Sequence, residues 1–277
     1  MSETDSPAVA PEPPIRDAST VMLVRDGATG PEVFLQRRVG AMAFAAGMTV
    51  FPGGGVDPSD GTAEIDWAGP APAWWAQKFA TTEERAKALV CAAVRETFEE
   101  CGVLLAGPTA DSVVSDTTGY REARGRLERR ELSLADFLAR EKLVLRADLL
   151  RPWANWITPT IEPRRYDTRF FVAVLPSGQL ADGATSEADD VQWRTPAEAL
   201  KRWRAGTDIL LPPTWSQLDA LAGFDSTALI LAADPVIDPI MPGLGGDEDP
   251  YRLAFPAADR YFADLPDRGQ LKGTARN

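Results

Sequence analysis

Apolar residues recur between positions 81 and 102 at the three- and four-residue spacing of an amphipathic helix. On a wheel of about 100° per residue, the residues that share one face are Val90, Cys91, Val94, Phe98 and Cys101. Thr81 can cap the N-terminus, and Glu84 can complete a capping box. Gly102 suits the position after a helix, where glycine adopts a left-handed backbone easily. The pattern predicts a helix that ends at about Cys101.

The opposite face of this predicted helix carries three acids, Glu96, Glu99 and Glu100, within an arc of about 100°. Like charges at this spacing repel each other by roughly a few tenths of a kcal/mol per pair. A divalent cation reverses this repulsion, and carboxylate oxygens are ligands that Mg²⁺ and Mn²⁺ prefer. Ala92 and Ala93 lie one turn earlier on the acidic side, where small side chains let a glycine-rich backbone approach. The helix therefore predicts a metal site that a loop completes.

Strand-like and helix-like segments alternate along the rest of the chain. The expected strands are residues 19–24, 32–37, 156–158, 169–174 and 191–193, and the expected helices are residues 133–142, 196–203 and 214–222. A glycine-rich loop covers residues 47–57 and is followed by a segment with Trp67, Trp74 and Trp75. These rings can stack on a ligand base or anchor a long loop to the protein body, and we expect anchoring.

Composition divides the chain into a tail, a domain and an extension. Residues 1–17 are rich in Pro and acids and are expected to be a disordered tail. Residues 18–232 are expected to form one domain with an insertion at about 58–82, and residues 233–277 an extension. Four apolar side chains of the extension lack an obvious place in the domain: Ile237, Ile240, Met241 and Leu244. The extension is therefore expected to pack on the domain or on a partner subunit, as in a homodimer.

Overall composition restricts the compartment and the partners. The chain has 277 residues, of which 44% are hydrophobic and 25% charged, so it can bury a substantial core. It has no run of ~20 apolar residues and no secretory signal, which favours a cytoplasmic protein. The net charge of −12 argues against nonspecific binding to nucleic acid or anionic membranes. Cys91 and Cys101 would lie about 15 Å apart on one helix, too far for a disulfide.

The chain contains no histidine, which narrows the chemistry that it can perform. Ser-His-Asp and Cys-His catalysis, zinc bound by histidine and imidazole acid–base catalysis are all excluded. Proton transfer must then use carboxylates, Lys, Tyr, Cys or a metal-bound water. This restriction increases the weight of the three acids on the predicted helix.

Two segments together resemble the Nudix box. The first is Phe51-Pro52-Gly53-Gly54, and the second is Arg95-Glu96-Thr97-Phe98-Glu99-Glu100-Cys101-Gly102-Val103. The family pattern is Gly-x5-Glu-x7-Arg-Glu-apolar-x-Glu-Glu-x-Gly-apolar, so Thr97 replaces an apolar residue. The joint occurrence of both segments makes a solvated, Glu-rich helix face the weaker interpretation.

The spacing between these two segments departs from the family pattern. Arg95 follows Gly54 by 41 residues, whereas the pattern has 14, so 27 residues are inserted. Counted back from Arg95, the first Glu of the pattern falls on Lys87, which is not a carboxylate. Four acids can supply that charge instead, unless it is absent: Asp57, Asp60, Glu83 and Glu84.

The resemblance implies an α/β/α sandwich around a mixed sheet and a hydrolase of nucleoside diphosphate linkages that uses Mg²⁺ or Mn²⁺. It implies Glu99 and Glu100 as metal ligands, Glu96 as a ligand or as the group that positions water, and the Gly54 carbonyl as a further ligand. Arg95 would orient a carboxylate, which includes the simpler role of a helix salt bridge. Glu96 is one candidate for the base. Glu187 is the other, and a role as an ordinary exposed loop acid is about equally expected for it.

A second resemblance narrows the substrate class. Leu35-Gln36-Arg37-Arg38, followed by Gly47 and by Phe51-Pro52-Gly53-Gly54, is similar to the signature of coenzyme A diphosphatases, with Ala43 where the signature has a second Arg. The long insertion and residues 156–171 look like the peroxisomal branch of that family and its bacterial relatives, although the chain ends without a peroxisomal address. The resemblance implies coenzyme A or acyl-coenzyme A as substrate, and phosphate contacts from Arg38.

Three further arginines precede or begin a predicted strand: Arg164, Arg165 and Arg169. They can bind phosphate, since a guanidinium forms paired hydrogen bonds with it, or they can be ordinary surface charges. Other diphosphates, namely a nucleotide sugar, a dinucleotide or a nucleoside triphosphate, are the alternative substrates. A nucleotide-binding module without catalysis is the alternative class, which the intact Arg95–Glu100 segment disfavours.

Overall fold

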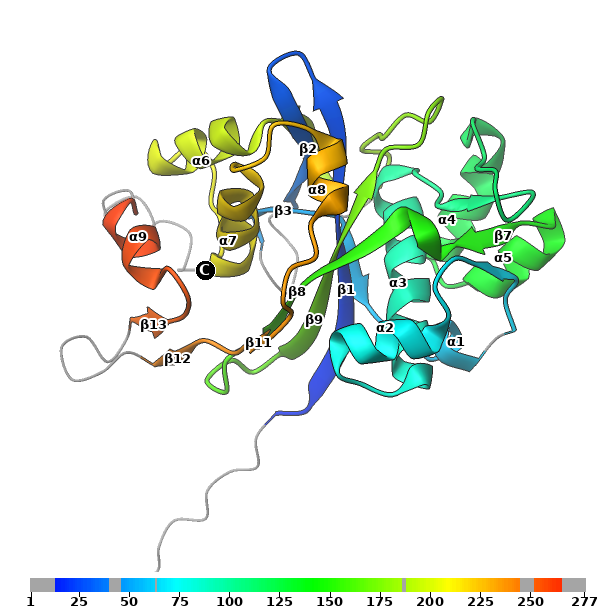
Figure 1. The fold of residues 1–277 in the computed structure, drawn as a ribbon, viewed down its shortest axis with the longest axis horizontal. Coiled ribbons are helices and arrows are strands. Elements are labelled where there is room, and N and C mark those ends of the chain that lie inside the picture. The colour runs from blue at the N-terminus through cyan, green and yellow to red at the C-terminus, as the bar shows by residue number, and fades with distance from the viewer. Residues whose placement is uncertain (1–12, 40–45, 63, 186–187, 245–251, 266–277) are drawn as a thin grey trace, which may run out of the picture.

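A mixed β-sheet with helices on both faces forms the centre of the protein, in a computed structural model that describes residues 13–39, 46–62, 64–185, 188–244 and 252–265 (Figure 1). The central sheet has the strand order β10-β2-β1-β9-β8-β11, with β3 paired to β2 and β4 paired to β1. The strands are β1 (Ile15–Gly27), β2 (Gly30–Arg38), β3 (Thr49–Val50), β4 (Gly53–Gly55), β8 (Leu150–Ile157), β9 (Arg165–Val174), β10 (Ala188–Arg194) and β11 (Pro239–Ile240). This architecture is the α/β/α sandwich expected from the sequence.

Helices and small sheets surround the central sheet. The helices are α1 (Pro58–Thr62), α2 (Pro72–Phe79), α3 (Glu83–Cys101), α4 (Arg121–Glu128), α5 (Leu134–Glu141), α6 (Pro196–Arg204), α7 (Pro212–Leu221), α8 (Thr227–Ala232) and α9 (Ala258–Ala263), with 3₁₀ turns η1 (Thr118–Tyr120) and η2 (Ala147–Leu149). A three-stranded sheet contains β5 (Trp67–Ala68), β7 (Val144–Arg146) and β6 (Ala106–Gly107), and a two-stranded sheet contains β12 (Gly243–Leu244) and β13 (Leu253–Ala254). In the described part of the chain, no helix is long and apolar enough to span a membrane.

Strand β1 lies in the middle of the sheet and is buried on both of its faces. It pairs in parallel with β9 from Ile15 opposite Arg165 to Val24 opposite Val174, and it forms an antiparallel hairpin with β2. Because side chains alternate along a strand, Val21 belongs to the core on one face and Met22 to the core on the other. The apolar run therefore fits a strand that is covered by helices on both sides.

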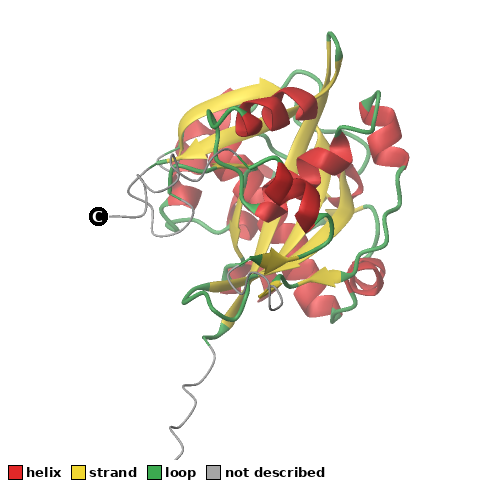
Figure 2. Cartoon of the chain, turned by 90° about the vertical axis from the view of Figure 1, so that its left-hand side faces the viewer, coloured by secondary structure: helices red, strands yellow, loops and turns green. Residues whose placement is uncertain are grey.

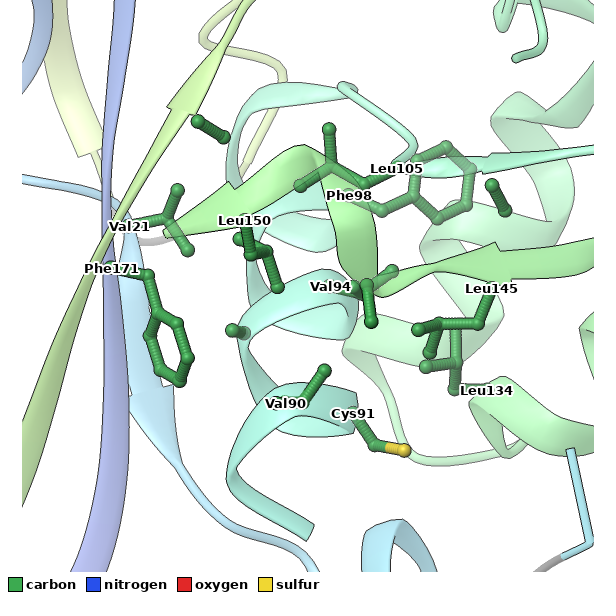
Figure 3. Packing of buried hydrophobic residues seen from close by; sticks show 14 of the residues in the cluster. Val21, Val90, Cys91, Val94, Phe98, Leu105, Leu134, Leu145, Leu150 and Phe171 are labelled. Atoms are coloured by element: carbon green, nitrogen blue, oxygen red, sulfur yellow. The ribbon is translucent and has the colours of Figure 1, made fainter. Parts of the chain in front are cut away.

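The first core surrounds α3, between the sheet on one side and α5 on the other. Figure 3 shows Val21 and Phe171 of the sheet on one side of α3 and the ring of Phe98 on the other side. There the Phe98 ring stacks on Phe137 of α5. The predicted apolar face of the helix is thus buried as expected. The second core lies under α6 and α7, which cover the strands on the face turned toward the viewer in Figure 2. Its largest fully buried side chains are Trp203 and Trp215.

The expected insertion is folded rather than loose, because its aromatic residues pack into the first core. Trp75 is fully buried and stacks on Phe79, with their ring centroids 6.0 Å apart. Trp75 also lies 5.7 Å from the ring of Phe171 in the sheet. The fully buried Trp75 therefore anchors this segment, as expected, and has no exposed face on which a base could stack.

Several expected boundaries differ from the structure: β8 begins six residues before the expected strand 156–158, and β9 begins four residues before the expected strand 169–174. Thr82, not Thr81, caps α3, and its side chain accepts a hydrogen bond from Arg85 N. The backbone N–H of Thr81 donates to the Ala76 carbonyl at the end of α2, so Thr81 caps the end of α2 rather than the start of α3. Strand β1 begins at Ile15, three residues before the expected domain boundary, because residues 15–17 pair with β9.

The C-terminal extension packs on the body of the same chain. Ile237 packs against the first core and Ile240 against the second. The side chain of Met241 is half exposed, and that of Leu244 lies outside the described residues. Met241 Sδ also accepts a hydrogen bond from Arg165 Nη2 at 3.5 Å, so three of the four apolar side chains have intramolecular contacts, and a homodimer stays an expectation.

Candidate active site

The last two turns of α3 place the three acids against the glycine strand β4. Glu96, Glu99 and Glu100 are all buried. A Cβ added to Gly54 would lie only 2.6 Å from Glu96 Oε1, so a larger residue would displace that carboxylate. The helix is also tied to β1, because Ser19 Oγ donates a 2.7 Å hydrogen bond to the Leu89 carbonyl and Ser19 pairs with Gly54. The expected approach of the glycine loop to the acidic side of the helix is confirmed.

Arg95 is buried at the centre of this site. Its Nε lies 3.1 Å from Asp60 Oδ1, and its Nη2 lies 3.0 Å from Asp60 Oδ2. Its Nη1 lies 2.8 Å from Glu96 Oε1 and 3.2 Å from Glu99 Oε2. Nη2 also donates to the Gly55 carbonyl at 2.8 Å. One guanidinium thus links α1, α3 and β4.

Of the four acids that can supply the charge of the first Glu in the pattern, Asp60 is the one that pairs with Arg95. Asp60 follows Gly54 by six residues, the same interval as between Gly and the first Glu of the pattern. The 27 extra residues therefore lie after Asp60, because Arg95 follows it by 35 residues instead of 8. The count back from Arg95 reached Lys87 instead of Asp60 because the insertion lies between Asp60 and Arg95.

Burial and shared charge change the acidity of the site. Burial raises the pKa of Glu99 to about 7, an effect that Arg95 opposes and the charge of Glu96 reinforces. Burial likewise raises the pKa of Asp60, although its hydrogen bonds with Arg95 act in the opposite direction. A single guanidinium shared among three carboxylates does not fully compensate the buried charge of Glu99.

Glu100 is held by different partners. Its Oε2 accepts hydrogen bonds from Gly53 N at 2.7 Å and from Gln36 Nε2 at 2.6 Å. Gln36 lies on β2 and is buried, and its Oε1 has no hydrogen-bond partner in the structure. The sequence analysis did not assign Gln36 to the site. The pattern that could have indicated this role is a polar residue on the inward face of a strand. Gln36 follows Phe34, which belongs to the first core, by two positions.

The chemistry of the site fits a hard divalent cation. Its donors are carboxylate oxygens, and the raised pKa of Glu99 shows a carboxylate that would gain from a nearby positive charge. Over the residues that the structure describes, no three Cys, Asp or Glu side chains already form a metal-binding group. Arg95 and Gln36 hold oxygens of Glu96, Glu99 and Glu100 instead. A carboxylate offers about four lone-pair sites on its two oxygens, so hydrogen bonds from these donors and coordination of a cation are compatible on the same side chain.

The arginines predicted to bind phosphate do not form one cluster. Arg164 is exposed in the turn between β8 and β9. Arg165 is buried, and its Nε donates to the Thr158 carbonyl at 3.2 Å. Arg169 is also buried and is paired with Asp167. Arg38 ends β2, and its backbone N–H donates to the Met48 carbonyl.

Two residues named in the sequence analysis lie outside the described part of the chain. They are Glu187, the second candidate base, and Ala43 of the coenzyme A signature. The loop before Glu187 is described up to Thr185 and contacts the end of α3, where Asp182 N donates to the Cys101 carbonyl at 3.0 Å.

Comparison with known proteins identifies relatives of this chain. The family model described as the NUDT19 Nudix domain matches residues 74–221. The acyl-coenzyme A diphosphatase NUDT19 of Xenopus laevis is 25% identical over 228 residues, which cover 70% of this chain and 60% of the frog protein. The putative nudix hydrolase 7 of Caenorhabditis elegans is 27% identical over 241 residues, which cover 82% of this chain and 67% of the nematode protein.

A solved structure shares the fold. The crystal structure of a NUDIX hydrolase from Alicyclobacillus acidocaldarius superposes with a TM-score of 0.62 at 27% sequence identity. The match covers 81% of this chain and 98% of the bacterial one. The described sheet and its flanking helices thus correspond to nearly the whole of that protein.

Proposed function

This chain belongs to the NUDT19 Nudix domain family, and on that premise we propose that it is a metal-dependent hydrolase of a nucleoside diphosphate linkage. The site supports this proposal because it gathers three buried acids on one helix next to a glycine strand. In a chain without histidine, these acids are the strongest candidates for binding a metal and for moving a proton.

Glu96, Glu99 and Glu100 would hold Mg²⁺ or Mn²⁺, with the Gly54 carbonyl as a further ligand. When bound, such an ion neutralises phosphate charge and makes a bound water more acidic. Arg95 orients Glu96 and Glu99 through its contacts with both carboxylates, and Asp60 fixes the guanidinium from the opposite side. Glu96 is the candidate base within the described residues.

For the substrate, we propose coenzyme A or an acyl-coenzyme A. The products would be adenosine 3′,5′-bisphosphate and phosphopantetheine or its acyl form. The observation that carries this proposal is the similarity to a protein named as an acyl-coenzyme A diphosphatase, of which this chain spans 60%. Arg38 and the exposed Arg164 are the proposed phosphate contacts. The burial and pairing of Arg169 make it a weaker candidate for that role.

Incubation of the purified protein with coenzyme A and Mg²⁺ or Mn²⁺, followed by nucleotide separation, tests the proposal. We expect adenosine 3′,5′-bisphosphate to form, and chelation of the metal to stop its formation. A parallel panel of a nucleotide sugar, a dinucleotide and a nucleoside triphosphate measures selectivity. Cleavage of one of these compounds without bisphosphate formation from coenzyme A would contradict the proposed substrate but support the proposed hydrolase activity. If no diphosphate is cleaved, the proposed hydrolase activity is contradicted as well.

A further inference from the structure

Arg124 of α4 is a buried arginine that contacts the end of the acid-bearing helix from outside the Nudix box. Its Nε donates a 3.0 Å hydrogen bond to the Glu99 carbonyl. Its Nη1 donates a 2.6 Å hydrogen bond to Asp182 Oδ1 in the loop that precedes β10. Only 6% of the surface of Arg124 is exposed. The side chain therefore joins α3, α4 and this loop.

The Glu99 carbonyl is a group that needs such a partner. The last four carbonyls of a helix lack the intrahelical donors that the others have. The adjacent Cys101 carbonyl accepts from Asp182 N at 3.0 Å, and the Gly102 carbonyl accepts from Thr117 Oγ1 at 2.8 Å. Contacts from two later segments thus fix the backbone that carries Glu99 and Glu100.

Electrostatics favour a cation at this position. The C-terminal end of a helix carries partial negative charge, and acids in its last turns add to that charge. A guanidinium in contact with the Glu99 carbonyl offsets part of it. The fit is close, because a Cβ added to Gly102 would lie 2.7 Å from Arg124 Nη1. Gly102 therefore serves the left-handed end of the helix, with φ of 73°, and also makes room for the guanidinium.

We propose that Arg124 is a positioning residue that holds the last turn of α3, so that Glu99 and Glu100 are correctly placed to bind the metal. This inference rests on the proposed function. Arg124 lies 24 residues beyond Glu100 and would act through the helix backbone rather than by touching the substrate or the metal.

The test measures Mn²⁺ binding. The loss of the electron paramagnetic resonance signal of free Mn²⁺ reports how much of the metal is bound. Arg124→Met keeps an unbranched apolar stem but removes the charge and the hydrogen bonds of the guanidinium. We expect it to bind Mn²⁺ about tenfold more weakly, the size of effect seen when groups supporting metal ligands are removed. Arg124→Lys should recover part of the affinity. The matched control is Arg121→Met, an exposed arginine of the same helix, which should bind Mn²⁺ like the unaltered protein.

Thermal unfolding of each variant separates positioning from general stability. A purely structural role would lower the melting temperature and leave the Mn²⁺ affinity of the folded protein unchanged, and that result would overturn the inference. If Arg124→Met does not fold, Asp182→Ala, which removes a half-exposed hydrogen-bond partner of Arg124, should weaken Mn²⁺ binding in the same direction. Unchanged affinity in that variant would also overturn the inference. Absence of Mn²⁺ binding in the unaltered protein would overturn the proposed function itself.

Discussion

A group of buried or partly buried charges lies near each end of helix α3, and the two groups differ in how their charges are matched. Near the N-terminus, Arg85 contacts Asp17 and Asp167, and Arg169 contacts Asp167 as well, so two guanidinium groups meet two carboxylates. Near the C-terminus, one guanidinium, that of Arg95, contacts three carboxylates of the described residues, namely Asp60, Glu96 and Glu99. One end of the helix therefore lies beside a matched network, in which positive and negative charges are equal in number. The other end lies beside a network in which carboxylates outnumber guanidinium groups.

This difference distinguishes a group of charges that supports the fold from one that is suited to bind a ligand. In the matched network, the hydrogen bonds and charge of Asp17 and Asp167 raise the pKa of Arg85, although burial opposes this shift. In the other network, burial raises the pKa of Glu99 to about 7 despite Arg95. We therefore expect changes in the first network to affect stability, and changes in the second to affect metal binding and turnover.

Asp167→Ala should have the largest effect on stability. The variant leaves Arg169 buried without its carboxylate and removes a partner of Arg85 and Asn155. Breaking a buried pair from one side costs about 3 kcal/mol of unfolding free energy, measurable by urea denaturation. Asp259→Ala is the control, because the Asp259 side chain is 97% exposed and its pair with Arg252 should contribute little. Equal stabilities of the two variants would show that the matched network does not support the fold.

Much of this contrast could be predicted from the sequence, but only for residues close together in the chain. The helical period placed Glu96, Glu99 and Glu100 on one face, because their separation lies within one helical turn. The partner of Arg95 could not be predicted, because Asp60 lies 35 residues away across an insertion whose position the spacing did not define.

Burial was the second property that the sequence pattern did not reveal. Arg169 was interpreted as a phosphate contact, yet it is buried beside Asp167, because β9 lies in the middle of the sheet. Gln36 and Arg124 were missed because their contacts with α3 join residues far apart in the chain. Only the fold brings such residues to the helix.

Glu99→Gln and Glu100→Gln should each reduce kcat by about a hundredfold, or ~2.7 kcal/mol, because each removes a proposed metal ligand. Their unfolding free energy without metal should fall by much less than that of Asp167→Ala, because Gln removes a buried charge, whereas Asp167→Ala leaves Arg169 buried without its carboxylate. Glu83→Gln, at the exposed start of the same helix, is the control. Metal-dependent activity that survives both changes would contradict the site assignment.

Asp60→Asn should weaken metal-dependent turnover by about tenfold, because Arg95 loses the carboxylate that fixes it. Asp60→Glu restores the acid of the family pattern and should retain most of the activity. Asp57→Asn is the matched comparison, since Asp57 was an equal candidate in the sequence but contacts the Ser59 N–H instead. Steady-state kinetics at saturating substrate measure all three variants. A larger loss in Asp57→Asn than in Asp60→Asn would reverse our assignment.

Gln36→Leu should have the smallest effect, a loss of about fivefold in kcat, or roughly 1 kcal/mol for one hydrogen bond. Glu100 keeps its hydrogen bond from Gly53 N in this variant, so the carboxylate stays partly oriented. A titration of activity with Mn²⁺ should show that most of the loss is recovered at high metal concentration. A loss as large as that of Glu100→Gln would mean that Gln36 has a more direct role than orienting Glu100.

A crystal structure of the protein soaked with Mn²⁺ tests the central claim most directly, because anomalous scattering locates the ion. We predict a peak about 2.1 Å from carboxylate oxygens of Glu99 and Glu100, near Glu96 and the Gly54 carbonyl. Arg95 should then keep its contact with Asp60 and still contact Glu96 or Glu99. A peak elsewhere, or no peak, would contradict the claim that this helix forms the metal site.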